Sequence, residues 1–272
     1  MSWITARRRR RVAGYAVVPL GLAAIGVMYA SLTGPGQAAA SAPPASQQAI
    51  ARGRYLFEQS CSSCHGLDAQ GSSVAPSLIG TGAASVDFQM STGRMPAKEP
   101  GAEMDRRPVV FGPRDIYDIS SYVASLGGGP PIPTEEQASP VGANPGLGQQ
   151  IFNANCAACH NFVGAGGALT NGKYAPSLNQ ATPVQIYEAM LTGPEAMPAF
   201  SDTTILPSEK RDIIAYVTQT SKEPNPGGFS LGRIGPVTEG IVGFFGGIGV
   251  LVFLAMWITM KRRGTHDETA ES

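Results

Sequence analysis

The chain has 272 residues, of which 43% are hydrophobic and 15% charged, and its 34 glycines and 22 prolines predict irregular segments between small domains. The formal net charge of +0 argues against nucleic-acid binding, because a surface that binds phosphates needs a surplus of basic side chains. The composition is also unfavourable for a single large hydrophobic core, whereas the length suits two modest domains.

The first hydrophobic segment follows a block of five arginines that ends at Arg11. Residues 12–32 contain no charged side chain, and as a helix they would extend over about 31 Å, which is enough to cross a bilayer. A cleaved signal peptide is the alternative, because the small residues Ala38 to Ala40 would suit cleavage. The hydrophobic stretch is longer than that of a usual signal peptide, so we favour a retained transmembrane helix.

An internal repeat follows. In each copy a glycine and a phenylalanine precede the first of two cysteines by eight and four residues, and an Ala-Pro-Ser-Leu segment comes later. Each copy ends in an apolar pattern with spacings of three and four residues, which predicts amphipathic helices over residues 115–126 and 208–220. The matching residues are Gly53, Phe57, Cys61, Ile119 and Tyr122 in the first copy, and Gly148, Phe152, Cys156, Ile213 and Tyr216 in the second.

The second hydrophobic segment, residues 240–260, is also uncharged and is followed at once by Lys261, Arg262 and Arg263. It predicts a second transmembrane helix. Basic residues flank the cytoplasmic ends of membrane helices, so both termini are expected in the cytoplasm and the repeat on the outer side of the cell membrane.

These features predict an all-α chain with two tandem small helical domains between an N-terminal and a C-terminal transmembrane helix. The expected division is a basic tail (1–11), a transmembrane helix (12–32), a tether (33–49), a first domain (50–126), a linker (127–146), a second domain (147–222), a tether (223–239), a transmembrane helix (240–260) and a cytoplasmic tail (261–272).

All four cysteines lie in two Cys-x-x-Cys-His runs, the signature of covalent c-type haem attachment. Two thiols one helical turn apart can add to the two vinyl groups of a haem, and the histidine that follows becomes the proximal iron ligand. Disulfides would not require that histidine, a thioredoxin-like pair needs a βαβ context, and a zinc ion would have to be shared between the copies. The residues concerned are Cys61, Cys64, His65, Cys156, Cys159 and His160.

The second axial ligand of each iron is expected to be methionine. The third histidine, His266, lies in the predicted cytoplasmic tail, so no histidine remains on the outer side. We favour Met95 and Met197 because each precedes a proline, which fixes the backbone and removes an amide donor. Met90 and Met190 occupy matching repeat positions and compete, with core packing as their alternative role. Met104 is a further candidate in the first copy.

Two prolines are candidates for orienting the histidines. Pro76 and Pro176 follow His65 and His160, and their carbonyl groups are candidates to accept the Nδ1–H of each ring. A turn is the alternative role of each proline. An iron with histidine and methionine on its two faces has no open site for a substrate, so the pattern predicts one-electron transfer and no bond-making site on this chain.

The layout resembles the dihaem cytochrome c subunit of the actinobacterial menaquinol–cytochrome c reductase, the cytochrome bcc complex. The resemblance extends from the arginine-rich start, through two Cys-x-x-Cys-His domains, to the glycine-rich C-terminal segment. It implies two cytochrome c domains with two covalently bound haem c groups. The first haem would be held by Cys61, Cys64, His65 and Met95, and the second by Cys156, Cys159, His160 and Met197.

The resemblance also implies partners. In that family the subunit accepts an electron from a Rieske iron–sulfur protein and delivers it to a haem-copper cytochrome c oxidase within a supercomplex. Quinol oxidation belongs to the cytochrome b and Rieske subunits, so the chain would be the electron-transfer subunit of a translocase. Two alternatives remain: a free-standing membrane-bound dihaem carrier between a dehydrogenase and an oxidase, and a dihaem peroxidase, which needs one iron with an open or displaceable ligand.

Overall fold

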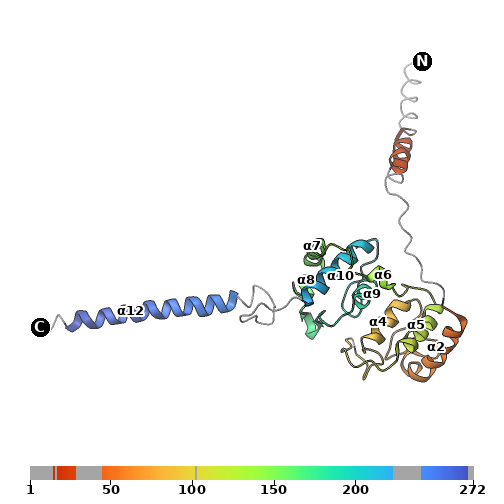
Figure 1. The fold of residues 1–272 in the computed structure, drawn as a ribbon, viewed down its shortest axis with the longest axis horizontal. Helices are drawn as coiled ribbons and strands as arrows, with labels where there is room; N and C mark the ends of the chain where they lie inside the picture. Colours follow the sequence, from red (N-terminus) through yellow and green to blue (C-terminus); the bar gives the residue numbers. More distant parts are fainter. Residues whose placement is uncertain (1–14, 16, 29–44, 102, 223–239, 269–272) are drawn as a thin grey trace, which may run out of the picture. The chain divides into compact units, whose positions relative to one another are not determined.

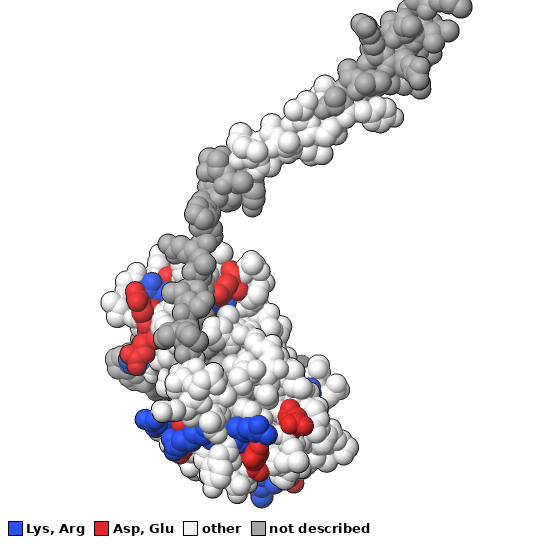
Figure 2. Space-filling model, turned by 90° about the vertical axis from the view of Figure 1, so that its right-hand side faces the viewer, with Lys and Arg blue, Asp and Glu red and all other residues white. Residues whose placement is uncertain are grey.

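The computed structural model describes residues 15, 17–28, 45–101, 103–222 and 240–268. The chain divides into two units, residues 1–43 and 44–272 (Figure 1). In the first unit, Val17–Met28 forms an apolar helix whose described residues carry no charge (Figure 2). This helix is shorter than a bilayer-spanning one, and most of the other residues of the predicted span 12–32 lie outside the described part of the chain.

The C-terminal hydrophobic segment is helical throughout. It consists of η3 (Val242–Ile248) and α12 (Gly249–Glu268). Val242–Met260, with a mean hydropathy of 2.1, is the one described helix that is long and apolar enough to cross a membrane. The prediction for residues 240–260 therefore agrees with a helix of the right length, whereas the described residues do not establish a second crossing.

Each copy of the repeat folds as four helices in the same order, together with loops. The first copy contains α2 (Gln47–Ser60), α3 (Ser62–His65), α4 (Ala83–Ser91) and α5 (Pro113–Ser125). The second contains α7 (Pro145–Asn155), α8 (Ala157–His160), α9 (Pro183–Thr192) and α10 (Pro207–Lys222). The two predicted amphipathic helices are thus α5 and α10, each beginning at a proline one or two residues before the expected start.

Local sequence explains where several of these helices begin. The Ser46 hydroxyl accepts a hydrogen bond from the Ala49 N–H at the start of α2. The Asn144 side chain caps α7, and Thr182 forms a capping box with Gln185 at the start of α9. Such caps satisfy N–H groups that have no partner within the helix.

The first and last helices of each copy cross at a glycine. A Cβ atom at Gly53 would lie 1.9 Å from the Asp118 carbonyl oxygen of α5, and one at Gly148 would lie 1.9 Å from the Asp212 carbonyl oxygen of α10. No side chain fits at either crossing, which explains why glycine occupies this position in both copies.

In each copy, an aromatic pair packs between the same two helices that cross at the glycine. The rings of Phe57 and Tyr122 have centroids 5.3 Å apart, and those of Phe152 and Tyr216 have centroids 5.4 Å apart. Both pairs are tilted, an arrangement that suits the ring quadrupoles. The four aromatic residues that mark the repeat in the sequence therefore hold its terminal helices together.

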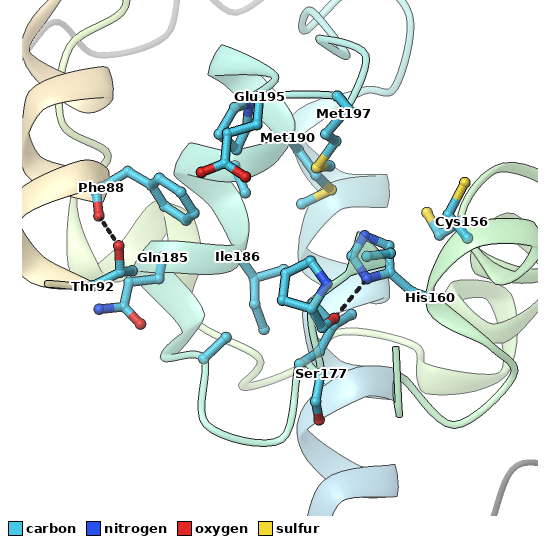
Figure 3. A pocket seen from close by; sticks show the side chains of 18 of the residues that line it. Phe88, Thr92, Cys156, His160, Ser177, Gln185, Ile186, Met190, Glu195 and Met197 are labelled. Atoms are coloured by element: carbon cyan, nitrogen blue, oxygen red, sulfur yellow. Dashed lines mark hydrogen bonds between the residues drawn. The ribbon is translucent and has the colours of Figure 1, made fainter. Parts of the chain in front are cut away.

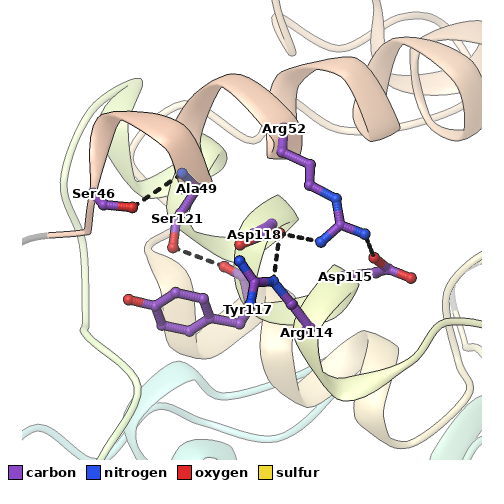
Figure 4. Close-up of polar contacts among 8 residues, drawn as sticks. All are labelled: Ser46, Ala49, Arg52, Arg114, Asp115, Tyr117, Asp118 and Ser121. Atoms are coloured by element: carbon purple, nitrogen blue, oxygen red, sulfur yellow. Dashed lines mark hydrogen bonds and ion pairs between the residues drawn. The ribbon is translucent and has the colours of Figure 1, made fainter.

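Ion pairs add to this crossing in the first copy. Arg52 of α2 contacts Asp118 at 2.9 Å and also contacts Asp115, both on α5 (Figure 4). The Asp118 side chain is only 3% exposed, so its charge needs a partner. In the second copy Asp212 of α10 instead accepts a hydrogen bond from the Asn144 backbone at 2.7 Å.

The region between the copies is more structured than its composition suggested. The expected linker, residues 127–146, contains α6 (Glu135–Ala138) as well as the start of α7. Ala138 is fully buried in the hydrophobic core of the second copy. Arg211 of α10 donates hydrogen bonds to the carbonyl groups of Ser139 and Val141, so this half of the linker packs on the second copy.

The described residues are mainly helical, as expected, but the second copy also contains a small hairpin. Strands β1 (Gly167–Ala168) and β2 (Tyr174–Ala175) pair antiparallel around the 3₁₀ turn η1 (Thr170–Gly172). Two-residue strands have no alternating pattern to reveal them, so the sequence did not indicate this sheet. The hairpin leads directly into Pro176.

Candidate functional site

The Cys-x-x-Cys-His runs form one short helical turn in each copy, α3 and α8. The His65 N–H donates to the Cys61 carbonyl at 3.0 Å, and the His160 N–H donates to the Cys156 carbonyl at 2.9 Å. In each copy the first cysteine caps this turn, and the second cysteine and the histidine follow one turn later. All four thiols are unbridged in the structure.

Both histidines are oriented by the prolines expected from the sequence. The Nδ1 of His65 lies 2.9 Å from the Pro76 carbonyl oxygen, and the Nδ1 of His160 lies 3.0 Å from the Pro176 carbonyl oxygen. A carbonyl can only accept, so Nδ1 carries the proton and Nε2 keeps its lone pair free. Burial lowers the pKa of His160, although this hydrogen bond opposes the shift, which favours the neutral ring that binds metals.

A cavity opens beside this turn in the second copy (Figure 3). It has about 1190 Å³ of empty space, including the solvent at its mouth, and its walls are mainly apolar. Cys156, Cys159 and His160 line one part of it, and Pro176 and Ile186 also contribute. A cavity with mainly apolar walls and a few polar groups suits an organic cofactor.

The candidate methionines of the second copy both line this cavity. Figure 3 shows the side chains of Met190 and Met197 close together beside His160. Met190 is 3% exposed and belongs to the core, whereas Met197 is partly buried and packs against that core. Met90 and Met95 repeat the arrangement in the first copy, with Met90 in the core and Met95 packed against it. The choice of Met95 and Met197 as ligands remains a prediction.

One group of residues that line the cavity was not expected from the sequence. The first copy supplies part of the wall of the second copy's cavity, at the end away from Cys156 in Figure 3. No pattern in the sequence links these positions to the second Cys-x-x-Cys-His run, which begins at least 50 residues further along the chain. The residues are Phe88, Thr92, Arg94, Glu103 and Arg106.

The two copies are joined around this wall by hydrogen bonds. The Gln185 side chain of α9 donates to the Ser91 hydroxyl and carbonyl at 3.1 and 3.2 Å. The Met104 N–H donates to Glu195 at 3.0 Å, and the Tyr174 hydroxyl donates to Asp105. Helices α4 and α9 also pack against each other. The two copies therefore pack against each other, and residues of both copies line the cavity.

Comparison with known proteins supports the same division of the chain. The profile of a family described as "Cytochrome C oxidase, cbb3-type, subunit III" matches twice, over residues 48–123 and 143–217, which are the two copies. The cytochrome bc1 complex cytochrome c subunit of Corynebacterium efficiens is 42% identical over 269 residues, covering 92% of this chain and 89% of that protein. The chain belongs to this family of cytochrome c subunits.

Other members have the same extent. The cytochrome bc1 complex cytochrome c subunit of Mycobacterium tuberculosis is 43% identical over 258 residues, covering 93% of this chain and 92% of that protein. A cbb3-type cytochrome c oxidase subunit of Rubrivivax gelatinosus is more distant, at 29% identity over 60% of this chain and 49% of that protein. The resemblance inferred from the motifs is therefore confirmed, and the chain is a cytochrome c subunit of the respiratory electron-transport type.

Cytochrome c domains imply covalently bound haem c, and the residues of this cytochrome c subunit fit that group. The thiols of Cys156 and Cys159 line the cavity with His160, whose Nδ1 is already engaged by Pro176. This leaves one nitrogen ligand, two thiols for thioether bonds and a nearby thioether sulfur. That donor set matches haem c.

Proposed function

We propose that this chain is a membrane-anchored dihaem c-type cytochrome in a menaquinol–cytochrome c reductase. It passes electrons from a Rieske iron–sulfur protein to a haem-copper terminal oxidase. The observation that carries the proposal is the duplicated site, in which each Cys-x-x-Cys-His turn has its histidine fixed by a proline carbonyl. Two such sites joined by one interface are what a short electron relay requires.

The residues have distinct roles in this proposal. Cys61 and Cys64 attach the first haem, and Cys156 and Cys159 attach the second. His65 and His160 coordinate iron through Nε2, because their Nδ1 atoms face proline carbonyl groups. When bound, each haem c takes up and releases a single electron.

Methionine sulfur is proposed as the sixth ligand, from Met95 in the first copy and Met197 in the second. Methionine raises the reduction potential of a haem and closes the iron to small molecules. Ligands of this kind favour electron transfer over peroxidase chemistry. The chain itself then has no quinone site and no small-molecule substrate, and quinol oxidation takes place on the cytochrome b and Rieske partners.

Anchoring keeps the relay beside its partners in the cell membrane. The helix Val242–Met260 is followed by Lys261, Arg262 and Arg263, which supports a cytoplasmic C-terminus and an extracytoplasmic position of the haem domains. The arginine block before residues 12–32 supports a second crossing with a cytoplasmic N-terminus.

Affinity purification of the tagged full chain from native membranes in mild detergent tests the proposal. A reduced-minus-oxidised spectrum and subunit identification are read from the same sample. We expect b-type haem, an iron–sulfur protein and oxidase subunits to co-purify with c-type haem. A c-type spectrum from this chain alone, or with a dehydrogenase, would instead identify a free-standing carrier and contradict the proposal.

A further inference from the structure

The two ends of the second copy's cavity are formed by different copies of the repeat. Figure 3 shows Cys156 at one end, and Phe88 and Thr92 of the first copy at the other. Cys159 also lines this cavity and lies in the same helical turn as Cys156 and His160. The vinyl groups that form thioether bonds lie on one side of a haem, and its two propionate carboxylates lie on the opposite side. Attachment to Cys156 and Cys159 therefore directs the propionates toward the first copy.

Two arginines of the first copy line that wall. The Arg94 side chain is only 8% exposed, stacks over the Phe88 ring at 5.1 Å and lies 3.6 Å from Glu195. Arg106 donates to the Gln185 side chain at 3.2 Å, and within the described part of the chain no carboxylate lies within 4.0 Å of it. Burial, and then the positive charge of Arg94, lower the pKa of Arg106. Two guanidinium groups that line one cavity wall are stabilised by an anion that contacts both.

Acidic side chains at the same wall are partly engaged elsewhere. Glu195 accepts a hydrogen bond from the Met104 N–H, and Asp105 accepts one from Tyr174. Burial raises the pKa of Glu195, an effect that Met104 and Arg94 oppose. Glu103 also lines the cavity, and one of its carboxylate oxygens is buried without a hydrogen-bond partner among the described residues. Arg94 and Arg106 are the basic groups of this wall, and Arg106, whose partner is the uncharged Gln185, is suited to receive a further carboxylate.

We propose that Arg94 and Arg106 of the first domain bind the propionate carboxylates of the haem attached to the second domain. This inference rests on the proposed function, because it requires a haem on Cys156 and Cys159. It makes the first domain part of the second haem site and not only a neighbouring electron carrier. The positive charge favours the reduced state of the second haem, so the first domain raises its midpoint potential.

The test is a spectroelectrochemical redox titration of the full haem-loaded chain in detergent. Arg106→Gln is the main variant, because Arg94 is adjacent to the candidate ligand Met95. The titration should show two one-electron waves, one for each haem. A Cys156→Ala/Cys159→Ala chain, which keeps only the first haem, shows which wave belongs to which haem. We expect Arg106→Gln to shift the oxidised-to-reduced ratio of the second haem about threefold to tenfold toward oxidation at a fixed potential, where tenfold equals about 59 mV. The first wave should not move.

A pH profile separates a propionate contact from a merely structural role. Without Arg106 the propionate pKa rises, so the midpoint of the second haem should fall more steeply with pH between about pH 5 and pH 8. Arg106→Lys should restore part of the wild-type behaviour, because it keeps the charge but loses the planar geometry.

Two control variants match the main one. Arg107→Gln removes the adjacent charge, but its side chain donates to the Pro96 carbonyl and does not line the cavity. Ser91→Ala removes a hydrogen bond across the same interface without changing charge. Neither should lower the second midpoint as Arg106→Gln does.

With both waves present in the wild type, an unmoved second wave and an unchanged pH profile in Arg106→Gln would overturn this inference alone. An equal shift in Arg107→Gln would also overturn it, because long-range charge would then be sufficient. A wild-type chain that lacks the second wave would contradict the proposed function, and this inference with it.

Discussion

Pro76 follows His65 by 11 residues in the first copy, whereas Pro176 follows His160 by 16 in the second, yet the two Nδ1-to-carbonyl distances are 2.9 and 3.0 Å. The longer segment of the second copy contains the hairpin of β1 and β2. The loop between the histidine and the proline therefore differs in length and structure between the copies, whereas the hydrogen bond at its end is the same. Orientation of the imidazole, rather than the path of the loop, is what both copies preserve.

The copies differ more in what surrounds this shared site. The first copy fastens its terminal helices with Arg52 and two aspartates, whereas the second uses the Asn144 backbone and Asp212. The first copy also contributes side chains to the cavity of the second. The two copies are thus alike at the turn that carries the histidine and at the helix crossing. They differ at the interface, where the first copy lines the cavity of the second.

Loss of a methionine ligand should have the largest effect, and it should be confined to one copy. We expect Met197→Ala to open the second iron, so that the reduced chain binds carbon monoxide, while the wild type does not. Visible absorption spectra with and without carbon monoxide provide the measurement. Met190→Ala is the matched variant, since Met190 lines the same cavity. Carbon monoxide binding in Met190→Ala but not in Met197→Ala would reassign the ligand.

Replacing the glycine at the helix crossing by a residue with a side chain should destabilise either copy. Gly148→Ala places a Cβ atom 1.9 Å from the Asp212 carbonyl oxygen, so we expect a loss of about 3 kcal/mol in the free energy of unfolding. Gly146→Ala on the same helix is the control, because its nearest neighbour is the Asn144 side chain at 3.4 Å. Thermal unfolding followed by circular dichroism compares them. Equal melting temperatures in the two variants would show that the crossing tolerates a side chain.

The ion pairs of Arg52 should matter to the first copy alone. Arg52→Ala leaves the buried carboxylate of Asp118 without its closest partner, and we expect a loss of about 1–3 kcal/mol. Arg54→Ala on the same helix is the control, because its ion pair with Glu58 is exposed and should have no measurable effect. Hydrogen exchange resolves the two copies. Equal loss of protection in α5 and α10 would contradict a local role.

At the interface between the two copies, stability is expected to depend on pH through one buried carboxyl group. Glu188 of α9 is fully buried, and its pKa rises from 4.5 to about 10, first through burial and then through the neighbouring Asp87 carboxyl of α4. The folded chain then binds this proton more tightly than the unfolded chain. Stability should therefore be greatest below about pH 4.5 for this group and should fall as pH rises toward about 10.

Glu188→Gln removes this titration, so its melting temperature should fall less between pH 6 and pH 9 than that of the wild type, by roughly ten degrees. Glu136→Gln, on the short helix α6 between the copies, provides a control for the loss of one exposed carboxylate. Identical pH slopes in the wild type and Glu188→Gln would show that the buried carboxyl does not hold its proton.

Sequence alone was sufficient for the parts of the site that lie close together in the chain. The contacts between each histidine and its proline carbonyl group are short-range features, and the structure confirms them. The Cys-x-x-Cys-His residues form one helical turn in each copy, and their attachment of haem stays a prediction. The sequence marked the Gly and Phe positions as parts of the repeat, and the helix crossing supplies the reason for the glycines. The two-residue strands and the buried Ala138 lacked any periodic pattern. Arg94 and Arg106 reach the second cavity only because the two copies dock, and no local rule predicts that contact.

The number of haems on each chain is the measurement that tests the account most directly. Intact mass spectrometry of the purified full chain, with haem quantified against protein, should find two haems in the wild type. It should find one in Cys156→Ala/Cys159→Ala and one in Cys61→Ala/Cys64→Ala. A single haem in the wild type, or haem retained by a chain that lacks all four cysteines, would contradict the account of two equivalent covalent sites.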